Sequence, residues 1–140
     1  MLEQLNAYNL TPFQAQQKNP LALAFLGDTV WELLVRERLL LSMAKVVSLH
    51  KQAVSKVNAN AQAKASLLIL PHLNESEQAI FQRGVNAQPK HNPPKNQNPF
   101  DYHKATGVEA LFGYLYLTNQ QERLYHLFNI AMEDISSSIK

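Results

Sequence analysis

The 140-residue sequence predicts an all-α domain. Apolar residues recur at helical spacing along most of the chain, and helix-start signals precede several of these runs. Strand signals are nearly absent, because no segment alternates cleanly and no hairpin dipeptide joins two apolar runs. The length suits one domain with a real core, and 46% hydrophobic against 17% charged residues is a globular composition. We therefore expect residues 1–140 to form a single helical domain.

The first long helix is predicted from Asn19-Pro20 to about Leu41. Asparagine is a favoured N-cap residue, and proline suits the first helical position. Because this helix is apolar nearly all round, we expect it to be buried at the centre of the domain. The segment before it, residues 1–18, allows a short helix after Thr11-Pro12.

Two helices are predicted next. One spans about residues 50–70, where an apolar stripe recurs at helical spacing and Pro71 ends the helix. The segment NESE (residues 74–77) resembles a capping box and begins a third helix that ends near Gly84.

Residues 86–101, NAQPKHNPPKNQNPFD, separate these helices from two more. The segment is rich in proline and asparagine, and loops of this length are usually functional or disordered. Helices are then predicted over residues 102–117 and 120–135, joined at Thr118-Asn119.

The formal net charge of +2 is unevenly distributed. Residues 36–64 carry six Lys or Arg against one acid, residues 81–104 carry four against one, and acids outnumber bases from residue 105 onward. A basic middle segment suggests an anionic partner such as nucleic acid. A solvated charged face explains the same pattern equally well.

The composition excludes several kinds of site and location. Without cysteine there are no disulfides or thiolate metal sites, and the five histidines lack the paired spacing of a zinc site. No phosphate-binding glycine loop and no Gly-x-Ser-x-Gly motif occurs. No signal peptide or membrane-spanning apolar stretch is visible, so we expect a cytoplasmic protein that does not bind membranes.

Two of the apolar helices each carry one central carboxylate. Asp28 interrupts LALAFLGDTVWELL (residues 21–34), and Glu109 is the only charged residue between Lys104 and Glu122. A buried carboxylate is costly unless its charge is compensated. Small residues one turn away would leave room for a cation and its waters: Ala24 near Asp28, and Ala105, Thr106 and Gly113 near Glu109. Mg²⁺ suits such a place, because it prefers oxygen ligands and keeps several waters.

A structural salt bridge explains the two acids equally well from spacing alone. Arg36, Arg83 or Arg123 could neutralise either carboxylate. Glu32 stands four residues before Arg36, the order that favours an ion pair along a helix. The spacing leaves both interpretations open.

The same segments resemble the catalytic domain of the ribonuclease III family. LALAFLGDTVWELLVRERLL is similar to the signature helix of that domain, and YHKATGVEALFGYLYL is similar to its second acidic motif. LHKQAVSKVNANAQA, RGVNA and PKN add to the resemblance, which covers about residues 19–128. Within the family the chain most resembles the Mini-ribonuclease III group, which lacks a separate double-stranded RNA-binding domain.

The resemblance implies a homodimer that cleaves double-stranded RNA with Mg²⁺, or with Mn²⁺ in its place, leaving 5′-phosphate and 3′-hydroxyl ends. It implies the 23S ribosomal RNA precursor as substrate and no activity on DNA. Asp28 and Glu109 become the catalytic, metal-binding residues. Ala24 and Thr106 replace two acids of full ribonuclease III, as they do in the Mini-ribonuclease III group, and Val85 replaces an arginine usual in that group. Apolar residues of the first long helix could pack in the core or across the twofold axis: Phe25, Leu26, Val30, Trp31 and Leu34.

Double-stranded RNA is recognised mainly through its phosphates and 2′-hydroxyls. The candidate RNA contacts are basic and amide side chains of the middle segment: Lys51, Lys56, Arg83, Asn86, Lys95, Asn96 and Lys104. Two other functions stay open, a non-catalytic dimeric RNA-binding protein on the same fold and a ribosome-assembly scaffold whose acids form salt bridges. Cleavage is favoured over pure binding, because a binder has no need for carboxylates on two facing helices.

Overall fold

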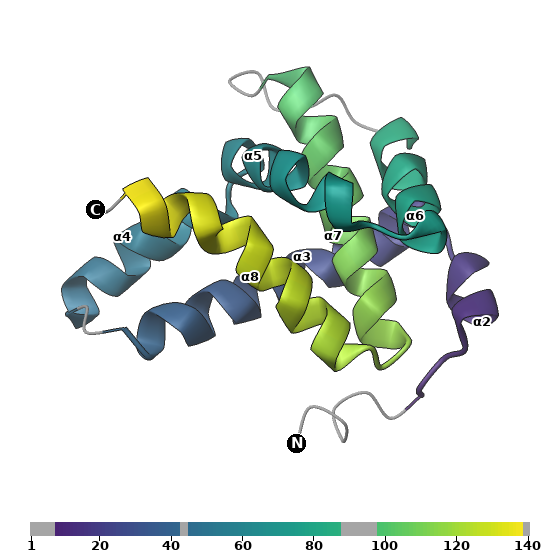
Figure 1. The fold of residues 1–140 in the computed structure, drawn as a ribbon, viewed down its shortest axis with the longest axis horizontal. Coiled ribbons are helices and arrows are strands. Elements are labelled where there is room, and N and C mark those ends of the chain that lie inside the picture. The colour runs from purple at the N-terminus through teal and green to yellow at the C-terminus, as the bar shows by residue number, and fades with distance from the viewer. Residues whose placement is uncertain (1–7, 43–44, 88–97, 139–140) are drawn as a thin grey trace.

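The computed structural model describes residues 8–42, 45–87 and 98–138, and every regular element in these ranges is helical. The all-α prediction is therefore confirmed. The order along the chain is α2 (Pro12–Gln16), α3 (Pro20–Leu40), α4 (Val46–Val57), α5 (Ala59–Ile69), the 3₁₀ turn η1 (Leu70–His72), α6 (Glu75–Asn86), α7 (Pro99–Leu117) and α8 (Gln121–Ser138) (Figure 1). Within the described residues, no helix has the length and apolar character that crossing a bilayer requires.

Helix α7 lies at the centre of the molecule and packs against α3, α5, α6 and α8 (Figure 1). Every residue from Ala105 to Leu115 is buried except Glu109, which is half-buried. The rings of Phe112 on α7 and Phe128 on α8 meet the fully buried Trp31 of α3 edge-on, with centroids 5.1 and 5.3 Å away. These apolar contacts fix the position of α7, and with it the position of Glu109.

The single helix predicted over residues 50–70 is wrong, because the chain turns at Asn58 and forms α4 and α5 instead. Asn58 is extended (φ −78°, ψ 165°), and its amide group donates to the carbonyls of Val54 and Ser55 at the end of α4 (3.3 and 3.2 Å). Its Oδ1 accepts from the Ala61 N–H at the start of α5 (2.9 Å). One side chain thus satisfies backbone groups at two helix ends, which allows the break.

The expectation that the first long helix is buried all round is also wrong. Helix α3 packs Val30, Trp31 and Leu34 into the core, but Phe25 is 84% exposed and Asp28 lies on the same solvent side. The other helices of the bundle cover only one side of α3, and its apolar outer residues remain uncovered in the monomer.

Capping residues mark the starts of α6 and α7. The predicted capping box at residues 74–77 is confirmed, with both Asn74–Glu77 hydrogen bonds at 2.9 Å, although α6 continues past Gly84 to Asn86. Helix α7 begins at Pro99, three residues earlier than predicted, because the Asn98 side chain accepts from the N–H of Phe100. The short helix allowed after Thr11 is present as α2.

Candidate active site

Helices α3 and α7 cross with their backbones in direct contact. A Cβ atom at Gly27 would lie 1.6 Å from the carbonyl oxygen of Glu109, and one at Gly113 would lie 2.1 Å from the carbonyl oxygen of Leu23. Both positions therefore require glycine. The space beside Gly113 holds the backbone of α3, so the expectation that it accommodates a cation is wrong. Because Asp28 directly follows Gly27, the crossing instead brings Asp28 and Glu109 together.

The two carboxylates differ in exposure and interact with each other. Asp28 is exposed, contrary to the expected burial, whereas Glu109 is half-buried between α3 and α5. Burial, and then the hydrogen bond and the charge of Asp28, raise the pKa of Glu109 to about 8. At neutral pH the pair therefore resists full ionisation unless a cation joins it.

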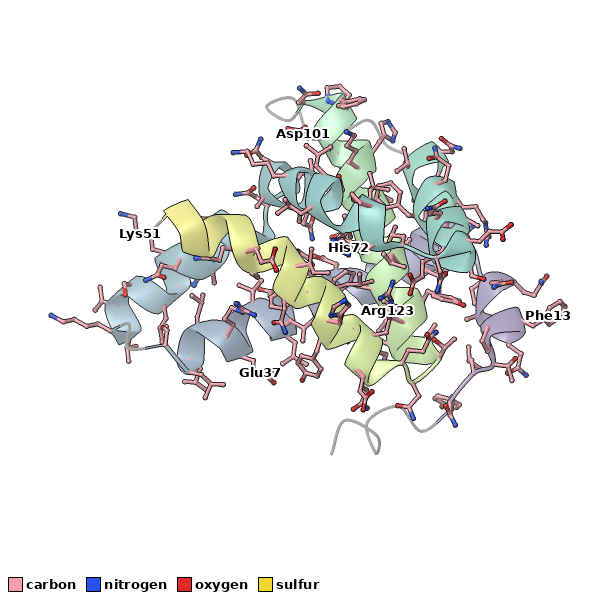
Figure 2. All side chains as sticks on the ribbon, viewed as in Figure 1. Phe13, Glu37, Lys51, His72, Asp101 and Arg123 are labelled. Atoms are coloured by element: carbon pink, nitrogen blue, oxygen red, sulfur yellow. The ribbon has the colours of Figure 1, made fainter. Side chains whose placement is uncertain are left out.

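The arginines considered as structural partners of this pair bind elsewhere. Arg36 forms the expected ion pair with Glu32 on the exposed side of α3 (2.9 Å). Arg123 of α8 binds Glu77 through two nitrogens (2.7 and 2.8 Å) and also donates to the carbonyl of His72, which lies beside it in Figure 2. Across residues 8–42, 45–87 and 98–138, no ion pair to Asp28 or Glu109 is present. The salt-bridge interpretation of the two acids therefore has no support.

Helix α5 contributes a polar side chain to the site that the sequence did not indicate. Gln62 is only 2% exposed, and its Nε2 lies 3.5 Å from Oε2 of Glu109, to which it donates. A glutamine within ANAQAKAS carries no capping or metal-ligand signal, and residue spacing cannot show which helix it faces. Only the packing of α5 on α7 reveals it.

The oxygen atoms of this site suit a hard divalent cation. Mg²⁺ is commonly bound by one or two carboxylates and keeps several waters. In the part of the chain that the structure describes, no three His, Asp or Glu side chains are grouped for metal binding. A cation held by Asp28 and Glu109 would accordingly take most of its ligands from water or from substrate.

The candidate RNA contacts on α4 are both accessible. Lys51 is exposed, on the opposite side of the molecule from Phe13 of α2 (Figure 2). Lys56 is half-buried, and its backbone carbonyl accepts a hydrogen bond from the indole N–H of Trp31 (3.0 Å). That bond anchors the last turn of α4 to the core.

The candidates on α6 and α7 have contacts within the protein. Arg83 donates to the carbonyls of Gln16 and Lys18 (2.7 and 3.0 Å) and so ties α6 to the segment between α2 and α3. Asn86 is exposed at the end of α6 and accepts from Gln82, and the Nζ of Lys104 lies 4.3 Å from the centroid of the Phe100 ring. Lys95 and Asn96 lie outside the described residues.

Comparison with known proteins identifies the family. The family model of the ribonuclease III domain matches residues 21–120. A Mini-ribonuclease 3 from Symbiobacterium thermophilum is 45% identical, over 83% of this chain and 89% of its own, and one from Desulfitobacterium hafniense is 46% identical, over 84% and 74%. A crystal structure of a protein from Fusobacterium nucleatum superposes with a TM-score of 0.74 at 31% identity, covering 84% of this chain and 94% of that one. The chain therefore belongs to the ribonuclease III family, within its Mini-ribonuclease III group.

Proposed function

We propose that this endoribonuclease cleaves double-stranded RNA at the Asp28–Glu109 pair with the help of Mg²⁺. One observation carries the proposal: two carboxylates meet at a glycine-lined helix crossing, and no protein cation pairs with them among the described residues. Such a pair is unfavourable by itself and becomes favourable once a divalent cation binds. Mn²⁺, which also accepts oxygen ligands, is expected to replace Mg²⁺.

Hydrolysis of a phosphodiester requires an activated water and stabilisation of the charge on the phosphate and the leaving oxygen. When bound, Mg²⁺ supplies Lewis acidity that lowers the pKa of water and offsets this charge. Glu109, fixed by the packing of α7, and Asp28, exposed on α3, would hold the cation at the crossing. The exposure of Asp28 lets an RNA backbone approach the pair from solvent. The products carry 5′-phosphate and 3′-hydroxyl ends.

A homodimer completes the proposed function. One site cuts one strand, whereas two sites related by a twofold axis cut both strands of a duplex. Phe25 is 84% exposed and lies on α3 three residues before Asp28, as expected if that side of α3 is covered by a second copy. The Mini-ribonuclease III resemblance supports the 23S ribosomal RNA precursor as substrate.

The proposed RNA contacts come from the basic part of the chain. We assign phosphate or sugar contacts to Lys51, Lys56, Lys104 and Asn86, and the exposure or half-exposure of all four side chains supports this assignment. Arg83 is already bound to two carbonyls, so an RNA contact would share its guanidinium. The assignments of Lys95 and Asn96 remain predictions from the sequence.

Cleavage assays test the proposal directly. The purified protein is incubated with a 23S precursor stem and with a generic RNA duplex, in Mg²⁺ or in EDTA. Asp28→Asn and Glu109→Gln should abolish cleavage, whereas Glu122→Gln, at an exposed acid of α8, should not. Cleavage of both strands that needs Mg²⁺ and both carboxylates supports the proposal. Tight RNA binding without cleavage by the intact protein would contradict it and favour the RNA-binding alternative.

A further inference from the structure

We propose that Gln62 is a positioning residue, which orients the Glu109 carboxylate for the divalent cation. This inference rests on the function proposed above. Its starting point is geometric: the buried Gln62 amide on α5 donates to Oε2 of Glu109 on α7 at 3.5 Å.

The burial of Gln62 calls for an explanation beyond packing. Its neighbours Ala63, Ala65 and Ser66 on α5 are buried as well, so the helix presents a small, close-packed surface to the core. A buried amide costs free energy unless it is hydrogen-bonded, and an apolar side chain of equal length would fill the same space without that cost. We therefore attribute the presence of an amide at position 62 to its hydrogen bond with Glu109.

An amide is the donor best suited to a carboxylate that must also bind a cation. A lysine or arginine at position 62 would neutralise Glu109 and compete with the metal ion. A purely apolar residue would leave the carboxylate free to rotate before the ion arrives. The neutral Gln62 donor takes one carboxylate oxygen and would leave the other free for a cation, as hydrogen-bonded partners of metal ligands commonly do.

The position of Gln62 in α5, relative to the Asn58 cap, explains why its amide faces Glu109. The break at Asn58 starts α5 with a new cap, and α5 then packs along α7. Four residues after the cap, Gln62 lies one helical turn into α5 and faces Glu109. Because the site lies where α3, α5 and α7 meet, each helix supplies one polar side chain to it.

The test compares Gln62→Met and Gln62→Asn with Gln78→Met in the full chain. Methionine keeps the length of the side chain without the donor, and asparagine keeps the donor but is one methylene shorter. Gln78→Met makes the same chemical change on α6, where the amide donates to the Leu73 carbonyl at an exposed position. Mn²⁺ binding is measured by calorimetry, and the Mg²⁺ concentration for half-maximal cleavage is measured with an RNA duplex.

We expect both Gln62 variants to weaken Mn²⁺ binding roughly tenfold and to raise the Mg²⁺ requirement, with KM for RNA unchanged. Gln78→Met should behave as the wild type. A Gln62 variant that retains its Tm and binds Mn²⁺ with wild-type affinity would overturn the inference, and Gln62→Asn decides if Gln62→Met fails to fold. If the wild-type protein binds no Mn²⁺, the proposed function is overturned as well. If Glu109→Gln loses Mn²⁺ binding and cleavage but Gln62→Met keeps both, only the role of Gln62 is overturned.

Discussion

Replacing Gly27 by alanine tests whether the helix crossing builds the site. The added Cβ would lie 1.6 Å from the carbonyl oxygen of Glu109, where real Cβ atoms keep at least 3.0 Å, so the backbones must separate by about 1.4 Å. Overpacking costs about 1–3 kcal/mol when side chains can adjust. The added Cβ meets backbone atoms of Glu109 and Gly113, which cannot adjust in that way, so we expect a cost of at least ~3 kcal/mol here. Alanine regains about 1 kcal/mol of helix propensity, which leaves a net loss of at least ~2 kcal/mol.

The expected result is a lower Tm and a larger loss of activity. For a domain of this size, ~2 kcal/mol corresponds to a drop in Tm of roughly 6–8 °C. Moving Asp28 and Glu109 apart by more than an ångström should reduce cleavage about a hundredfold. Thr29→Ala, at an exposed position two residues further along α3, is the control and should leave both values near those of the wild type. A Gly27→Ala protein with the Tm and cleavage rate of the wild type would refute the reasoning.

Three further predictions concern other parts of the molecule. Burial alone would raise the pKa of Glu77, but hydrogen bonds from Arg123 and from the backbone N–H of Asn74 lower it below 4.5. The Glu77–Arg123 pair therefore stabilises the fold above pH 4.5, and this stabilisation is lost as the pH falls below that value. Urea denaturation of Arg123→Met should therefore show a loss of about 3 kcal/mol at pH 7 and a clearly smaller loss at pH 3, and an equal loss at both would contradict this account. Asn58→Ala removes hydrogen bonds at the ends of two helices and should lower the free energy of unfolding by ~1–2 kcal/mol in the same assay. An unchanged free energy of unfolding would contradict this role of Asn58. Lys51→Met should weaken RNA binding at low salt and reduce the slope of log K against log salt by about 1, whereas an unchanged slope would remove Lys51 from the RNA contacts.

The helices with strong local signals could be predicted from the sequence. Asn19-Pro20 marks the start of α3, and Asn74 with Glu77 marks the start of α6, because each cap depends only on residues within one turn. The break at Asn58 escaped prediction, since a single asparagine inside an apolar helical pattern is compatible with a continuous helix. Its extended backbone is stabilised by contacts with both flanking helices, which no local pattern shows.

The two carboxylates could be located in the sequence, but their environment could not. An acid in an apolar helix suggests burial, yet Asp28 is exposed because the apolar residues around it face in different directions, Trp31 into the core and Phe25 to solvent. Apolar patterning does not distinguish a core face from a surface that a second chain covers. Gln62 was missed for a related reason, because its role depends on Glu109, 47 residues further along the chain.

The crossing of α3 and α7 stabilises the fold by close packing but brings two carboxylates, Asp28 and Glu109, into an unfavourable contact. The contact of Gly27 and Gly113 lets α3 and α7 pack closely, and the burial of Trp31 against Phe112 and Phe128 stabilises that arrangement. The same closeness places Asp28 against Glu109 and raises the pKa of Glu109 to about 8, which is unfavourable for two ionised acids. Apolar packing elsewhere along α7 therefore holds the two acids together before any ion binds. If the proposed function is right, a divalent cation would find its carboxylate ligands already in place, and its binding would relieve the repulsion that the fold imposes.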